Sequence, residues 1–202
     1  MKKLIPLLAL AAASVVCISP LSAQAEKKKG APKQQPLVPG ARLSPHETVY
    51  NRLASSAGRT LVSITYGRPY SAKGGKGEAR KIWGGLVKWD AADRLGSDEA
   101  TTFLAERDLD FGGTTIPAGI HALYIIPSEN GTSQLAFSKN ANKWGVPVDT
   151  KNDIARVPLK KETISETVNQ LTIAIETPAP DQGVLKIKWE NTQFSVPFKV
   201  KG

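Results

Sequence analysis

Cysteine is almost absent from this sequence: its 202 residues include only Cys17. Cys17 lies in an N-terminal segment that we expect to be removed. The mature chain is then expected to have no disulfide, no thiolate nucleophile and no cysteine-ligated metal. Long apolar runs are lacking as well, because a membrane-spanning helix needs about 20 apolar residues and the longest run, residues 4–18, is shorter. We therefore expect no transmembrane segment.

The first 25 residues have the three-part pattern of a bacterial secretory signal. Lys2 and Lys3 precede the apolar run, and Ala23-Gln24-Ala25 supplies the small residues of a cleavage site. The pattern predicts cleavage near Ala25 and a periplasmic or extracellular mature protein. Residues 26–41 are rich in lysine, glutamine, proline and glycine without a hydrophobic period, so they are expected to form a disordered basic tether. Residues 42–202 are expected to form a single domain.

Aromatic residues are also few, at 6% of the chain, although the net charge is +9. A nucleic-acid-binding surface typically combines basic residues with aromatic residues on one face. This chain lacks that pattern and carries a secretory signal, so we expect no nucleic-acid partner. Residues 68–88 hold six basic residues and one acidic residue. Their net charge of +5 would suit an anionic envelope polymer as a partner.

Apolar and polar residues alternate through most of the domain, and a period of two is typical of β-strands with one solvated face. Short segments of this kind, separated by glycine, proline and asparagine turns, indicate an all-β fold. We expect an antiparallel β-sandwich, with a jelly roll or a barrel as the alternative. Residues 90–100 are the exception, where a short helical or irregular segment is expected. The expected strands are residues 48–50, 60–66, 101–105, 120–126, 134–138, 154–159, 171–175, 185–189 and 194–200.

Six short motifs together resemble a family of secreted bacterial proteins, the domain of unknown function 2911. The motifs are Ser44-Pro45-His46, Tyr66-Gly67-Arg68-Pro69, Glu99-Ala100-Thr101-Thr102-Phe103, Ile116-Pro117-Ala118-Gly119, Trp144-Gly145 and Trp189-Glu190-Asn191-Thr192. They occur in the family's order and span nearly all of residues 43–200. The resemblance implies a β domain that carries a secretory signal. It implies no catalytic residue, because no activity is established for the family.

Common enzyme signatures are missing, and the two histidines are the main candidates for chemistry. The sequence contains no Gly-x-Ser-x-Gly motif, and His46-Glu47 lacks the second histidine of a zinc-protease helix. His46, His121 and Glu99 would suit a two-histidine, one-carboxylate site for a divalent metal such as zinc or iron. The alternative is that His121, on a strand with apolar neighbours, is a hydrogen-bonded core residue. No other cofactor is indicated.

A second group of candidates consists of two arginines and two acidic residues: Arg68, Arg94, Asp98 and Glu99. Arginine recognises carboxylate and phosphate groups in a bidentate manner, so the two arginines are candidates to hold a small anionic ligand. The alternative is a structural network of arginine and glutamate. Because Arg68 follows one expected strand and Glu99 precedes the next, antiparallel pairing would place both at the same end of the domain.

Two functions of different classes remain open. The first is a secreted, non-enzymatic module that binds an envelope component or a small anionic ligand through the arginine–carboxylate group. The second is a hydrolase-type or metal-dependent enzyme that uses the two histidines and Glu99. An enzyme of this kind needs these groups within hydrogen-bond reach of one another and of a cleft.

Overall fold

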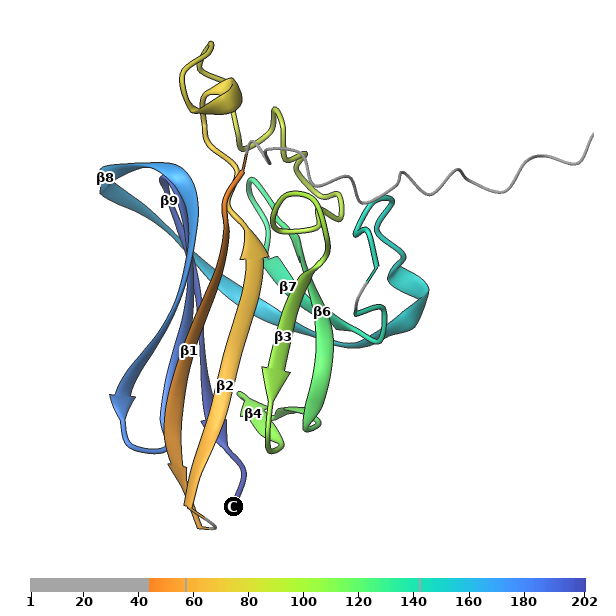
Figure 1. Ribbon diagram of the computed structural model, residues 1–202, viewed down its shortest axis with the longest axis vertical. Coiled ribbons are helices and arrows are strands. Elements are labelled where there is room, and N and C mark those ends of the chain that lie inside the picture. The colour runs from red at the N-terminus through yellow and green to blue at the C-terminus, as the bar shows by residue number, and fades with distance from the viewer. Residues whose placement is uncertain (1–43, 57, 142) are drawn as a thin grey trace, which may run out of the picture. The chain divides into compact units, whose positions relative to one another are not determined.

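The computed structural model describes residues 44–56, 58–141 and 143–202 (Figure 1). These residues belong to one compact unit that spans residues 41–202. The signal peptide and the tether expected at residues 1–41 lie outside the described residues and stay predictions. Within the described part of the chain, no helix has the length and apolar character that a membrane crossing requires.

The described residues form one antiparallel sheet of nine strands, and the predicted all-β fold is confirmed. The strands follow one another across the sheet in the order β1-β2-β3-β6-β7-β8-β9-β4-β5. Two short 3-10 turns, η1 (Lys73–Gly75) and η2 (Thr150–Asn152), lie between strands. The strands are β1 (His46–Ser55), β2 (Gly58–Gly67), β3 (Thr101–Ala105), β4 (Leu109–Phe111), β5 (Thr114–Ile116), β6 (Gly119–Ile126), β7 (Ser133–Ser138), β8 (Asp153–Ala179) and β9 (Gln182–Val200).

The long strand β8 connects the two halves of this sheet. Its first part, up to Leu159, pairs with β7, and the rest, from Lys160 onward, pairs with β9. The sheet folds over through β8, so that β1 lies against the later part of β8, where Ala54 N donates to Pro180 O at 2.6 Å. The layers of the expected sandwich are therefore two halves of one continuous sheet.

A single apolar core lies between the two halves. Phe111 of β4 shows this most directly, because its ring lies 5.1 Å from the rings of both Phe137 in β7 and Phe198 in β9. Trp189, predicted to be a core residue, is 3% exposed. Trp83, from the long connection between β2 and β3, packs edge-on against Trp189 and closes one end of the core.

That connection, residues 68–100, is irregular, and residues 90–100 contain no helix. Asp90, Leu95 and Asp98 have φ values of 56°, 56° and 63°, a left-handed conformation that residues other than glycine rarely adopt. Several contacts hold the segment in place: the Leu95 side chain is buried, the Thr101 hydroxyl donates to Leu95 O at 2.6 Å, and Asp93 exchanges two backbone hydrogen bonds with Ile125 of β6. The segment is therefore a fixed part of the end of the sheet.

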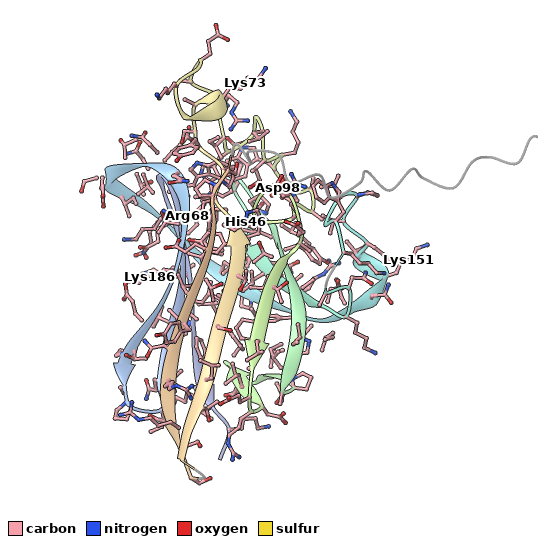
Figure 2. The ribbon with its side chains drawn as sticks, in the orientation of Figure 1. His46, Arg68, Lys73, Asp98, Lys151 and Lys186 are labelled. Carbon is pink, nitrogen blue, oxygen red and sulfur yellow. The ribbon has the colours of Figure 1, made fainter. Side chains whose placement is uncertain are left out.

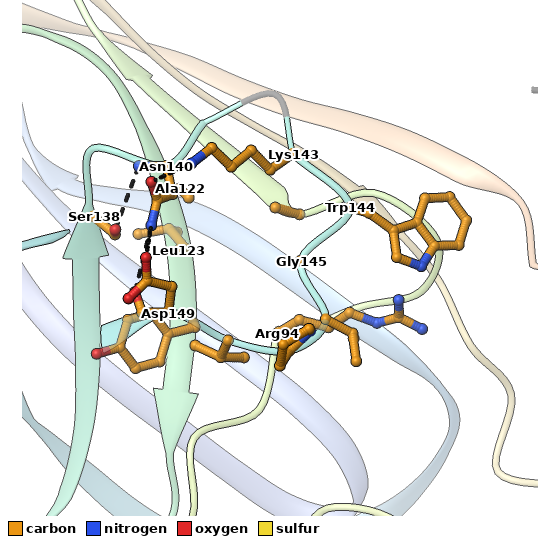
Figure 3. Close-up of a pocket in the computed structure, with 14 residues that line it drawn as sticks. Arg94, Ala122, Leu123, Ser138, Asn140, Lys143, Trp144, Gly145 and Asp149 are labelled. Carbon is orange, nitrogen blue, oxygen red and sulfur yellow. Dashed lines mark hydrogen bonds between the residues drawn. The ribbon is translucent and has the colours of Figure 1, made fainter. Parts of the chain in front are cut away.

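The connection between β7 and β8, residues 139–149, covers the outer face of β6. Successive side chains of a strand point to opposite faces, yet β6 is buried on both. Leu123 belongs to the core, and its neighbours Ala122 and Tyr124, which point the other way, are also buried. Both line a cavity together with residues of this connection (Figure 3).

Candidate functional site

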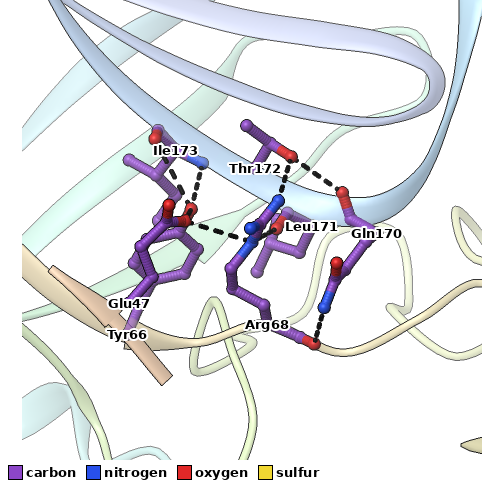
Figure 4. A network of polar contacts seen from close by, with 7 residues as sticks. All are labelled: Glu47, Tyr66, Arg68, Gln170, Leu171, Thr172 and Ile173. Atoms are coloured by element: carbon purple, nitrogen blue, oxygen red, sulfur yellow. Dashed lines mark hydrogen bonds and ion pairs between the residues drawn. The ribbon is translucent and has the colours of Figure 1, made fainter. Parts of the chain in front are cut away.

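Arg68 binds across the fold from the end of β2 to the far half of the sheet (Figure 4). Its Nε atom lies 3.1 Å from Glu47 Oε2 and donates to Leu171 O at 3.1 Å. Its Nη2 atom donates to Thr172 Oγ1 at 3.0 Å. The backbone takes part as well, because Arg68 O accepts a hydrogen bond from Gln170 Nε2 at 3.0 Å.

Tyr66 continues this network towards the core. Its hydroxyl donates to Glu47 Oε2 at 2.8 Å and accepts from Ile173 N at 2.8 Å. Burial raises the pKa of Tyr66 well above its ordinary value, and the neighbouring Glu47 carboxylate raises it further. The hydroxyl therefore stays protonated and serves as a fixed link between β2 and β8.

Arg68 thus takes part in a network with a glutamate, but this glutamate is Glu47 and not Glu99, and the network links β2 to β8, whereas the expected structural alternative would have held residues 90–100. The guanidinium is directed at β8 and Glu47. Because the Arg68 and Glu47 side chains are 25% and 38% exposed, their ion pair alone contributes at most about 1 kcal/mol. The hydrogen bonds to β8 add to it.

Glu99 interacts with His46 instead. His46 Nε2 lies 3.0 Å from Glu99 Oε2 and 4.0 Å from Asp98 Oδ2. The pair lines a surface hollow of about 280 Å³, which also includes Thr65 and Thr102. Figure 2 shows His46, Arg68 and Asp98 gathered at one end of the sheet, below the protruding segment that carries Lys73. The predicted placement of Arg68 and Glu99 at the same end agrees with this geometry.

His121 is not part of that group. It is 5% exposed, and its Nε2 atom donates to Pro117 O at 2.8 Å. His121 pairs with Phe103 inside β3, whereas Glu99 lies before that strand begins. The structure thus does not bring the two histidines and Glu99 together. In the described ranges, no group of three or more His, Cys, Asp or Glu side chains is arranged to hold a metal ion.

Arg94 lies apart from Arg68 and is held by its own loop. Its Nε atom donates to Gly96 O at 3.1 Å, and Nη1 donates to Asp98 O at 2.8 Å. The guanidinium carbon lies 6.0 Å from the centre of the Trp144 ring, at a cation–π distance. A guanidinium has five N–H donors, so these two backbone bonds fix its direction and leave donors for a ligand.

A cavity of about 410 Å³ lies between the connection of β2 to β3 and the outer loops; we call it the cationic cavity. Three cations, Lys73, Arg80 and Arg94, line it, against one carboxylate, Asp93. Burial raises the pKa of Asp93 above its ordinary value. The volume of the cationic cavity is within the range of small-molecule sites, about 300–1,000 Å³. The charge balance of the lining favours an anion.

Two residues of the cationic cavity carry buried donors without a partner. Ser97 Oγ and Trp189 Nε1 are both buried and make no hydrogen bond. An unsatisfied buried donor costs about 1–3 kcal/mol, and buried polar groups in proteins are almost always paired. Because both atoms are shielded from solvent, they are not presented to a ligand in the cavity, and their lack of partners is a local cost of the packing.

A second cavity, of about 170 Å³, lies beneath residues 139–149; we call it the loop cavity. Figure 3 shows the Trp144 ring and the Arg94 guanidinium at one end of it and the Asn140–Asp149 pair at the other. Asn140 Nδ2 donates to Asp149 Oδ2 at 3.3 Å, and Lys143 Nζ donates to Asn140 Oδ1 at 2.9 Å. One end is thus aromatic and cationic, and the other is a hydrogen-bonded polar network.

Sequence reasoning selected Arg94 but missed Lys73, Arg80, Ser97 and Asp93 as neighbours in one cavity. The net positive charge of residues 68–88 was the available signal for the two cations. Nothing in the sequence marked Ser97 or Asp93, because their position depends on the left-handed conformation of Leu95 and Asp98.

The comparison with protein-family models decides the membership of the chain. The family described as protein of unknown function (DUF2911) matches residues 44–198. The chain belongs to this family. The match covers β1 to β8, all but the last two residues of β9, and both cavities, so the cavities lie within the DUF2911 domain. No curated protein and no solved structure matched the chain significantly.

Proposed function

We propose that this DUF2911 protein is a non-enzymatic binding module for a small anionic ligand or an anionic envelope component, and that the ligand occupies the cationic cavity. The observation that carries the proposal is the lining of this cavity by three cations from separate positions, Lys73, Arg80 and Arg94. Arg80 is oriented by Ser71 O and Tyr70 O, and Arg94 by Gly96 O and Asp98 O. Preorganised cations bind anions at a lower entropic cost than mobile ones.

The role of Arg68 in this function is structural: it holds the end of β2 beside β8, where the connection that lines the cavity begins. Location is part of the proposal. On the basis of the signal pattern in residues 1–25, we propose that the protein acts in the periplasm or outside the cell.

The test is a thermal-shift and calorimetric titration of the full chain with citrate, inorganic phosphate and the neutral control glycerol. A ligand at 100 times its dissociation constant stabilises the folded state by about 2.7 kcal/mol, a rise in Tm that a melt detects. Lys73→Gln is expected to weaken anion binding. Lys151→Gln, which removes an exposed lysine from the distant turn η2, is expected to leave it unchanged.

Binding of no anion, or equal effects of the two lysine variants, would contradict the proposal. Added salt provides a further check, because exposed charges are screened beyond about 8 Å at physiological ionic strength. Anion affinity is therefore expected to fall as sodium chloride is raised from 20 to 200 mM, because salt weakens the attraction between the cations of the cavity and the anion.

The His46–Glu99 pair is the specific observation that favours an enzyme as a second candidate. A histidine hydrogen-bonded to a carboxylate can act as a general base, and this pair lies in a surface hollow. The proposed reaction class is hydrolysis, in which His46 and Glu99 take part and His121 does not. A panel of chromogenic esters, glycosides and phosphoesters tests it: turnover by the wild type that His46→Ala abolishes supports an enzyme, and no turnover removes this candidate.

A further inference from the structure

The cationic cavity and the loop cavity meet at two residues. Arg94 and Val146 line both of them. The Arg94 guanidinium therefore stands between a cavity with two further cations and a cavity with an exposed aromatic ring at its rim. A ligand that contacts Arg94 from one cavity is in position to extend into the other.

Exposed apolar side chains gather around the same junction. The described residues include five exposed large hydrophobic side chains, and three of them, Leu86, Trp144 and Val146, line one or both cavities. Trp144 is 49% exposed and Val146 is 55% exposed. Exposed apolar groups scattered singly need no explanation, whereas a group of them beside a polar cavity is typical of a binding site.

We infer that the two cavities form one extended site, and that its ligand is an acidic oligosaccharide whose carboxylate lies in the cationic cavity while an adjacent sugar ring stacks on Trp144. This inference rests on the proposed anion-binding function and names its ligand class. The indole of Trp144 offers a flat apolar surface with a polar N–H, which suits the C–H face and the hydroxyls of a sugar ring.

The lining of the loop cavity favours a sugar ring over a lipid tail. Lys143 and Asp149 place two charged groups at one end of the cavity, and an acyl chain beside them would take away water that hydrates these charges. The cavity of about 170 Å³ is below the usual range for a whole ligand, about 300–1,000 Å³. It therefore accommodates one ring of a ligand that continues past Arg94 into the larger cavity.

The experiment compares probes of increasing length by calorimetry on the full chain. The probes are galacturonic acid, its linear trimer, the neutral trisaccharide maltotriose, and phosphatidylglycerol vesicles as the lipid alternative. The trimer is expected to bind at least about tenfold more tightly than the monomer, since a stacked ring adds on the order of 1.4 kcal/mol. Maltotriose, which lacks the carboxylate, is expected to bind more weakly than the trimer.

Variants of Trp144 separate this inference from the proposed function. Trp144→Ala is expected to weaken trimer binding more than monomer binding and so to remove the advantage of the trimer, while Trp144→Phe restores part of that advantage. Tyr50→Ala, which removes an exposed aromatic ring of β1 that lines neither cavity, is the matched control and is expected to have no effect.

Each other outcome overturns a defined statement. If Lys73→Gln weakens monomer and trimer alike and Trp144→Ala changes neither, the cationic cavity binds anions but the extended site is wrong. If vesicles bind through Trp144 and the trimer does not bind, the ligand is a lipid headgroup and the oligosaccharide inference is wrong. If citrate, phosphate and both uronic acid probes fail to bind, the proposed function itself fails.

Discussion

His46 and Glu47, adjacent residues of β1, direct their side chains to opposite faces of the sheet. His46 pairs with Glu99 at the surface, whereas Glu47 accepts a hydrogen bond from Tyr66 and forms an ion pair with Arg68 between the two halves of the fold. Neighbouring positions in a strand thus belong to two different polar groups, as the alternation of side chains in a strand requires. The His46–Glu99 pair is open to solvent, and the group of Glu47, Tyr66 and Arg68 links the two halves of the fold.

Arg68→Ala is expected to lower the free energy of unfolding by about 1–3 kcal/mol, because it removes the donor to Leu171 O and the ion-pair partner of the partly buried Glu47 carboxylate. Arg59→Ala, at an exposed position near the start of β2, is the control and is expected to change stability by less than about 0.5 kcal/mol. Urea unfolding measures both. The anion-induced rise in Tm is expected to persist in Arg68→Ala; its selective loss would make Arg68 a ligand-binding residue.

Tyr66→Phe tests the link from β2 to β8. The variant keeps the ring but leaves the buried Ile173 N–H without its acceptor and removes the hydrogen bond from the Tyr66 hydroxyl to Glu47. We expect a loss of about 1–3 kcal/mol in the free energy of unfolding. Tyr50→Phe, which removes an exposed hydroxyl from β1, is the control. Equal stabilities of the two variants would show that the Tyr66 hydroxyl contributes nothing.

Asp93→Asn tests the charge of the cationic cavity through the pH dependence of stability. Burial raises the pKa of Asp93 above its ordinary value of 3.8, so the folded state holds this proton more tightly than the unfolded state. The corresponding stability is fully present below pH 3.8 and is lost as pH rises through the folded-state pKa. The asparagine side chain carries no charge, so the variant avoids this loss of stability. Its side-chain oxygen can still accept the hydrogen bond from Leu95 N.

We therefore expect Asp93→Asn to gain stability relative to wild type at pH 7 and to lose that gain towards pH 3, as measured by urea unfolding across this range. Anion binding is expected to tighten as well. Asp108→Asn, which replaces an exposed loop carboxylate that also accepts a backbone N–H, is the control for the loss of one negative charge. A stability difference that does not vary with pH would refute the prediction.

Ser97→Ala and Thr101→Val form a matched pair of buried hydroxyl deletions. Ser97 Oγ has no partner, so its removal is expected to change the free energy of unfolding by less than about 0.5 kcal/mol or to raise it. Thr101 Oγ1 donates to Leu95 O, and its removal is expected to cost about 1 kcal/mol. Urea unfolding of the two variants measures this difference.

The strands were predictable because a sheet with one buried face imposes a period of two on the sequence. The outer cover of β6 also left a trace: residues 120–126 are almost continuously apolar, as expected for a strand buried on both faces. The continuity of β8 was not predictable. Residues 160–168 are polar and exposed on most positions, so they carry no hydrophobic pattern to join the segments on either side.

The partner of Arg68 was not predictable for a different reason. Glu47 and Glu99 are chemically equivalent, and the choice between them depends on how β8 bends back towards β1, a contact between residues more than 100 positions apart. The register of the strands explains why the residues of the predicted metal site, His46, His121 and Glu99, do not come together. His121 and Glu99 both lie near β3, but a difference of a few residues along paired strands separates them.

The sharing of β8 by both halves of the sheet has a consequence for how the domain unfolds. Separating the halves would break the pairing of β8 with β7 or with β9 and would also detach β1 from β8. Each half would therefore lose contacts at its edge strands if the other half unfolded. The domain has no internal boundary at which it can melt in part, and a single cooperative transition follows. Closure of the fold also requires β1 to meet β8 across more than a hundred residues, a topology of high contact order that folds slowly.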